Sequence, residues 1–154
     1  MRNAKGFTLI ELLIVIAIVA ILAAVLIPNV LNARKRALTA AAQSYARDVV
    51  VALESAQTAN TKINYTLNGE NSRIQIVASG EVRNAVELPL EPDGTETPPV
   101  DMTAYLKDPT SGITDVWLKG PSTIQVQQTL PGGTQCVELD TSSNTLTTES
   151  GDCQ

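Results

Sequence analysis

A run of 21 residues, from Phe7 to Ile27, is almost entirely apolar and contains one charged side chain, Glu11. At a rise of about 1.5 Å per residue, an α-helix of this length spans roughly 30 Å, which is the thickness of the hydrocarbon core of a bilayer. Few other folds bury so long an apolar segment. The sequence therefore predicts a membrane-spanning helix near the N-terminus.

Glu11 is the unusual residue of this segment. A charged side chain at the centre of a bilayer costs at least about 2.5 kcal/mol on insertion scales, so the carboxylate needs either a partner or a route to water. In one interpretation it reaches the headgroup region within the first turn of the helix, where the macrodipole favours negative charge. In the other it has a functional partner. The apolar run alone leaves both open.

A conventional secretory signal is the first alternative to a retained helix. Such a signal has an apolar core of about 7 to 15 residues followed by a small-residue cleavage site. Here Ala23 and Ala24 lie inside a longer apolar run. The length favours a retained membrane span.

The residues around Glu11 also carry a family resemblance. Lys5-Gly6-Phe7, followed by Thr8 to Val15, resembles the processing site of type IV pilins, and the short leader, Phe7 and Pro28 resemble the type IVa class. The resemblance covers residues 1–36. It implies that a prepilin peptidase removes residues 1–6 by cleaving between Gly6 and Phe7, and then methylates the new amine.

That processing gives Glu11 a candidate partner. N-methylation keeps the α-amine of Phe7 positively charged, and pairing opposite charges in a low dielectric offsets the cost of burying both. We therefore expect Glu11 of one subunit to pair with the Phe7 ammonium of another. Phe7 and Glu11 would then set the register of subunits in an assembly.

The orientation of the span does not follow from charge. Arg2 and Lys5 precede the span and Arg34 to Arg36 follow it, so the positive-inside rule is close to a tie. The resemblance implies a cytoplasmic N-terminus and a single pass through the inner membrane. Cys136 and Cys153 fit an exterior location, where they can form a disulfide worth about 3 kcal/mol in the chain-entropy model. Two unpaired buried thiols are the alternative.

A second half of the helix follows Pro28. No Gly or Pro occurs between Pro28 and Gly69, and apolar residues recur at helical spacing, at Leu38, Ala41, Tyr45, Val49, Ala52 and Ala56. We expect one helix from about Thr8 to about Asn60. Pro28 removes a backbone hydrogen bond to Ala24 and predicts a kink, which is either passive or, as the family implies, a point where the helix extends.

Short, turn-bounded segments with strand character follow the helix. Strands are predicted over 73–77, 115–118, 123–127, 135–139 and 144–148, a short helix over 101–106 and a mobile loop over 89–100. An antiparallel sheet packed on the amphipathic half of the helix gives the α+β class. The expected divisions are a leader (1–6), a membrane and polymerisation helix (7–28), an amphipathic helix (29–60), a connecting region (61–114) and a sheet with a disulfide loop (115–154).

Catalytic and ligand-binding chemistry finds little support. The chain has no His, no cysteine pair at metal-ligand spacing, no EF-hand spacing and no Gly-rich phosphate loop, so no enzyme, cofactor or metal is expected. From Ala85 onward, eleven acidic residues face only Lys107 and Lys119, a net charge of −9. Direct nucleic-acid binding by this region is therefore disfavoured.

The combined prediction is a structural subunit of a type IV pilus, a homo-oligomeric helical filament that ends as an extracellular fibre. The resemblance implies roles in twitching motility, adhesion and transformation, and partners that include the inner-membrane assembly machinery, a secretin and minor pilins. A type II secretion pseudopilin is the nearest alternative, although Cys136 and Cys153 favour a pilin. A minor pilin acting as an adhesin or DNA receptor is the second.

Overall fold

A computed structural model describes residues 7–61, 63–69, 72–89, 99–110 and 112–154. Its first element is one helix, α1, from Leu9 to Ala59, which confirms the predicted helix to within a residue at each end. The chain divides into two compact units, Met1–Arg36 and Ala37–Gln154. The predicted loop over 89–100 falls mostly on residues 90–98, outside the described residues.

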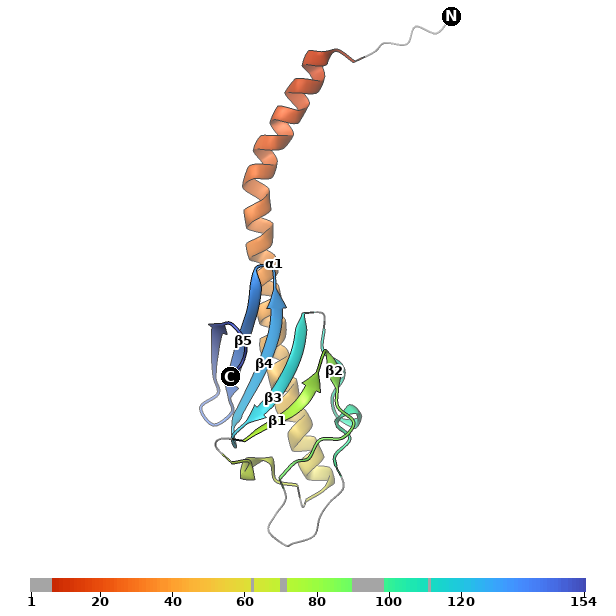
Figure 1. Cartoon of the computed structure of the whole chain (residues 1–154), viewed down its shortest axis with the longest axis vertical. Helices are drawn as coiled ribbons and strands as arrows, with labels where there is room; N and C mark the ends of the chain where they lie inside the picture. Colours follow the sequence, from red (N-terminus) through yellow and green to blue (C-terminus); the bar gives the residue numbers. More distant parts are fainter. Residues whose placement is uncertain (1–6, 62, 70–71, 90–98, 111) are drawn as a thin grey trace, which may run out of the picture. The chain divides into compact units, whose positions relative to one another are not determined.

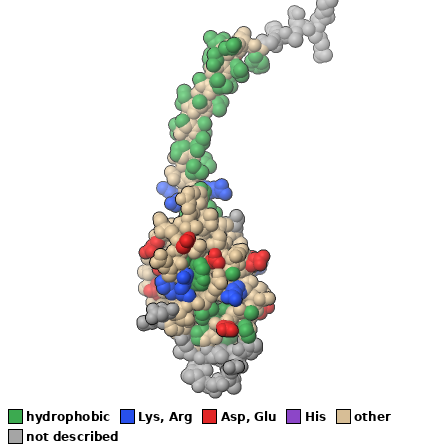
Figure 2. Space-filling model, viewed as in Figure 1, with side chains coloured by type: hydrophobic (Ala, Val, Ile, Leu, Met, Phe, Trp, Pro, Cys, Tyr) green, Lys and Arg blue, Asp and Glu red, His purple; other side chains and the backbone are tan. Residues whose placement is uncertain are grey.

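The first unit contains the apolar half of α1. Its large hydrophobic side chains from Leu9 to Leu31 are between 47% and 75% exposed, and Figure 2 shows them covering the visible side of this half. By length and composition α1 can cross a membrane. The helix runs without interruption through Pro28, where Asn29 Nδ2 donates a hydrogen bond to the carbonyl of Val25 at 3.1 Å.

In the second unit, α1 buries one face. Tyr45, Val49, Ala52 and Ala56 are buried as predicted, and Leu53 joins them. Leu38 and Ala41, which were expected on the same face, are only half-buried. Four of the residues buried on this face are alanines, Ala42, Ala46, Ala52 and Ala56.

The sheet has six antiparallel strands in the order β2-β1-β3-β4-β5-β6. Their bounds are β1 Arg73–Ala78, β2 Glu81–Val82, β3 Ile113–Lys119, β4 Thr123–Leu130, β5 Gly133–Asp140 and β6 Thr145–Ser150. Figure 1 shows this sheet lying over the C-terminal half of α1. The α+β class is confirmed, as are the five predicted strands, each of them longer than expected.

The short elements differ more from prediction. β2 was not anticipated, since two residues carry no periodic signal, and neither was the 3-10 turn Tyr65–Leu67. The expected helix over 101–106 is a 3-10 turn, Met102–Ala104, capped by the carboxylate of Asp101. Its anchor is Met102, which is fully buried.

The core lies between α1 and the inner face of the sheet. It contains Leu53, Ile76, Val116, Leu118 and Val126, each with an exposed fraction of zero. At its edge, the Tyr45 hydroxyl donates a hydrogen bond to the carbonyl of Lys107 at 2.8 Å. Burial, together with the nearby carboxylates of Asp108 and Asp48, raises the pKa of Tyr45, so this hydroxyl stays a donor.

The contact between helix and sheet can be tested at Leu53. Leu53→Ala leaves a cavity and should cost about 2–5 kcal/mol in the free energy of unfolding. Val51→Ala, on the exposed side of the same helix turn, is the control and should cost far less. Urea unfolding of the detergent-solubilised chain, followed by the fluorescence of Trp117, the sole tryptophan, measures both. Equal losses would contradict the packing described.

Candidate functional site

The N-terminus of α1 is closed by a reciprocal pair of side chains, Thr8 and Glu11. The Thr8 backbone N–H and hydroxyl both donate to Glu11 Oε2, at 2.9 and 2.7 Å. The Glu11 backbone N–H donates in return to Thr8 Oγ1 at 3.3 Å. This is the capping-box arrangement, in which two backbone donors of the first turn are satisfied by one Thr and one Glu three residues apart.

The cap explains how Glu11 is accommodated in a single chain. Its carboxylate lies where the positive end of the helix dipole favours it, and it accepts two hydrogen bonds from its own chain. Sequence reasoning missed the role of Thr8, although the signal was present as Thr-x-x-Glu before an apolar run. Both bonds go to Oε2, and among the described residues none is donated to Oε1.

The other residues expected to act with Glu11 are placed as follows. Gly6 lies outside the described residues. Phe7 is 92% exposed, and Pro28 is exposed within α1. A single chain therefore places Thr8 and Glu11 together and leaves Phe7 without burial. The assembly role of Phe7 and Glu11 and the kink at Pro28 stay predictions.

The cysteines do meet. Cys136 in β5 forms a disulfide with Cys153, with a Cα–Cα distance of 5.0 Å, so the alternative of two unpaired thiols is wrong. The bond ties the segment after β6 back to β5, the strand next to the β6 edge of the sheet. Both cysteines are buried.

Polar side chains from three strands hold the same C-terminal segment. Arg73 in β1 donates to the Cys153 carbonyl at 3.4 Å, while Lys119 in β3 and Gln125 in β4 donate to the Gln154 carbonyl at 2.7 and 3.0 Å. The Arg73 guanidinium also lies 4.4 Å from the centre of the Trp117 ring, at cation–π distance. Sequence reasoning missed these contacts because they join residues far apart in the chain.

Two comparisons with known proteins bear on the class of this chain. Residues 1–27 match the family model described as the prokaryotic N-terminal methylation motif. Over 68 residues the chain is 63% identical to the type IV wide pilus major component PilA4 of Thermus thermophilus. This aligned segment covers 44% of this chain and 50% of that protein. The match thus spans about half the length of this relative. No solved structure matches the chain.

These findings, together with the fold, define a class. A methylation motif, one long apolar helix and a six-stranded antiparallel sheet make a pilin-like α+β fold. The motif and the similarity to a major pilin support a type IV pilin, as the sequence resemblance predicted.

The helix cap yields one prediction. Thr8→Val keeps the side-chain shape but removes the hydroxyl, and loss of an N-cap costs about 1 kcal/mol. Backbone amides of the first turn should then exchange with solvent about fivefold faster in detergent micelles, measured by NMR. Thr8→Ser, which keeps the hydroxyl, should exchange like the native chain. Equal exchange in the Val and Ser variants would contradict the cap.

The disulfide between Cys136 and Cys153 yields a second prediction. Replacing both cysteines by Ser should lower the free energy of unfolding by about 3 kcal/mol, because the unfolded chain regains the freedom that the closed loop removed. Urea unfolding followed by Trp117 fluorescence measures the change. Ser142→Ala and Ser143→Ala, in the exposed turn between β5 and β6, provide a matched double-substitution control. An unchanged midpoint in the Cys variant would refute a stabilising role.

Proposed function

We propose that the chain is a structural subunit of a type IV pilus and polymerises through its N-terminal helix. The observation that carries the proposal is the apolar half of α1, whose large side chains from Leu9 to Leu31 have no partner within the described residues. Exposed apolar surface of this extent marks a membrane or protein contact. Both contacts are available to a pilus subunit. Its apolar helix lies in lipid before assembly and packs against the helices of other copies in the fibre.

Processing comes before assembly in this proposal. A prepilin peptidase cleaves between Gly6 and Phe7, removes the leader 1–6 and methylates the Phe7 amine, in agreement with the methylation motif over residues 1–27. Before assembly the subunit is anchored in the inner membrane by residues 7–28, with its N-terminus in the cytoplasm. Residues 29–60, 61–114 and 115–154 then form the amphipathic helix, the connecting region and the sheet of the exterior part.

The cap geometry supports the proposed role of Glu11. A carboxylate has about four lone-pair sites, and the two bonds from Thr8 occupy only Oε2. Oε1 is left for a cation, so the Phe7 ammonium of a second subunit can pair with Glu11 while the cap stays intact. The cap holds the carboxylate at a fixed position on the helix. Pairing with it therefore fixes how far one subunit is shifted along the helix of the next.

The finer functions belong to the same proposal. Twitching motility, adhesion and transformation would follow from extension and retraction of the fibre by the inner-membrane machinery, through a secretin and with minor pilins. Pro28, exposed in the apolar half of α1, would be the point where the helix extends. Direct nucleic-acid binding remains disfavoured by the net charge of −9 from Ala85 onward.

Two alternatives differ in where the subunit is found. The disulfide between Cys136 and Cys153 favours a pilin over a type II secretion pseudopilin. The similarity to a major pilus component favours a major subunit over a minor adhesin or DNA receptor. Mass spectrometry of sheared surface fibres decides, because the major-pilin proposal expects the dominant protein to begin with methylated Phe7. Absence from fibres with a secretion defect on deletion would favour the pseudopilin.

The role of Glu11 gives the corresponding prediction. Glu11→Val should leave leader removal and membrane insertion intact but abolish fibres, because the Phe7 ammonium of the next subunit loses its partner in a low dielectric. Glu54→Gln, an exposed acid near the C-terminal end of α1, is the control and should give normal fibres. Electron microscopy of sheared fibres and the mass of the membrane-bound subunit measure the two steps. Normal fibres from Glu11→Val would refute the proposal.

A further inference from the structure

The last strand of the sheet, β6, is an unprotected edge. It follows β5 in unbroken register from Asp140↔Thr145 to Gln135↔Ser150, and no described strand pairs with its other side. All its side chains except Leu146 are exposed. Soluble proteins usually guard such an edge with Pro, Lys, a bulge or a very short strand. β6 has six residues, three of them Thr, and none of these devices.

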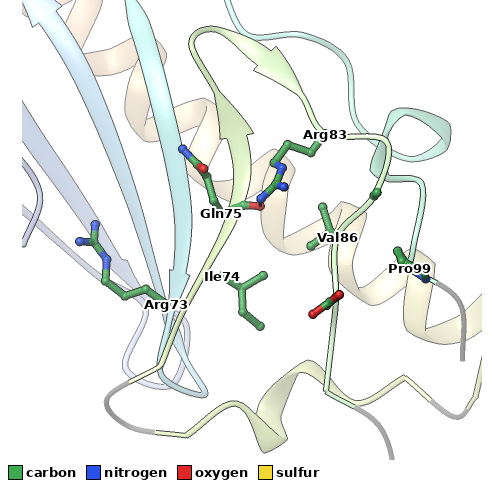
Figure 3. A pocket seen from close by; sticks show the side chains of 8 residues that line it. Arg73, Ile74, Gln75, Arg83, Val86 and Pro99 are labelled. Carbon is green, nitrogen blue, oxygen red and sulfur yellow. Dashed lines mark hydrogen bonds between the residues drawn. The ribbon is translucent and has the colours of Figure 1, made fainter. Parts of the chain in front are cut away.

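The opposite edge of the sheet is open along half its length. β2 pairs only with Val77 and Ala78 of β1, so Arg73 to Gln75 have β3 on one side and no described strand on the other. Beyond β2 the chain turns away and pairs Val86 with Val100 instead. Figure 3 shows the resulting groove between β1 and the segment carrying Val86. It has a volume of 460 Å³.

The two edges run in the same direction. Four antiparallel pairings separate β1 from β6, namely β1–β3, β3–β4, β4–β5 and β5–β6, so β1 and β6 are parallel to each other. A second copy in the same orientation therefore presents its β6 parallel to the open part of β1. A polar filament requires this relation, because all its subunits point the same way.

The register also aligns the side chains. Gln75 lies opposite Trp117, and the row continues through Gln125 and Glu138 to Thr147 in β6. Side chains two residues apart share a face, so Glu149 lies on the same face as Gln75 and Arg73. A sheet continued across two copies would thus bring the Glu149 carboxylate to the face that carries Arg73, one of the two cations that line the groove.

Charge favours the same pairing. Arg73 and Arg83 line the groove against one acid, Glu87, whereas β6 has one charged residue, Glu149, and it is negative. Within the described residues, the Arg83 side chain donates one long hydrogen bond, from Nη1 to the Gln75 carbonyl at 3.5 Å, and most of its five side-chain donors make no bond there. Arg73 is held by Cys153 and Trp117, which leaves Arg83 as the principal cation.

We infer that the β6 edge of one subunit docks beside the open edge of β1 in a second copy of this chain, with Glu149 paired to Arg83. The inference rests on the proposed function, since it describes a contact within the fibre. The contact is head-to-tail, because two different edges meet. Such contacts propagate into a ring or a helical filament.

Charge exchange tests the contact in intact fibres. Arg83→Glu and Glu149→Arg each place like charges together, and each should lower fibre yield by about tenfold. The double variant restores opposite charges and should recover most of the yield. Glu54→Arg, a charge reversal on the exposed side of α1, is the control for net charge and should leave the yield unchanged.

A second measurement reads the contact directly. A benzophenone amino acid at Thr148 in β6 should cross-link assembled subunits at residues 73–87, mapped by mass spectrometry of sheared fibres. Native fibres with unaffected charge variants, or with cross-links elsewhere, would overturn the edge contact and leave the pilus proposal standing. Absence of the chain from native fibres would overturn both.

Discussion

The carboxylate of Glu11, set in an apolar helix, is the constraint on which the rest of the structure depends. Glu11 lies in a segment whose large side chains are exposed from Leu9 to Leu31, so lipid or other protein surrounds it. Thr8 lowers the cost of placing this carboxylate in an apolar segment of one chain, because its N–H and hydroxyl donate hydrogen bonds to one carboxylate oxygen. Among the described residues, none donates a hydrogen bond to the second oxygen, Oε1. In the proposed function, the cap therefore stabilises Glu11 in the membrane-bound subunit, and the Phe7 ammonium of a second subunit pairs with the remaining oxygen in the fibre.

The sequence predicted the elements with strong local signals. The helix from about Thr8 to about Asn60 followed from length and from apolar spacing at Tyr45, Val49, Ala52 and Ala56, and the structure places it at Leu9–Ala59. Strands were found wherever alternation was supported by turn residues, as around Pro131 and Gly132. Gly132 has φ +104°, a conformation open to Gly, so the turn between β4 and β5 could be predicted from residue type.

The features that sequence reasoning missed depend on distant residues or on very short segments. β2 has two residues and exists because β1 offers Val77 and Ala78 as partners. The contacts of Arg73, Lys119 and Gln125 with the C-terminal segment join positions 29 to 80 residues apart. The Thr8 cap is different, since its Thr-x-x-Glu spacing is local and was readable.

The two contacts proposed between subunits lie in different media, so they have different effects on assembly. A pair between Glu11 and the Phe7 ammonium lies among apolar helices, where screening by salt is weak and a lone charge is costly. It therefore governs whether a subunit joins at all. A pair between Arg83 and Glu149 lies at the surface of the sheet, where exposed ion pairs contribute about 0–1 kcal/mol and weaken with salt. Such a pair determines which strand edges meet and in which register. The packed helices provide most of the free energy that stabilises the fibre.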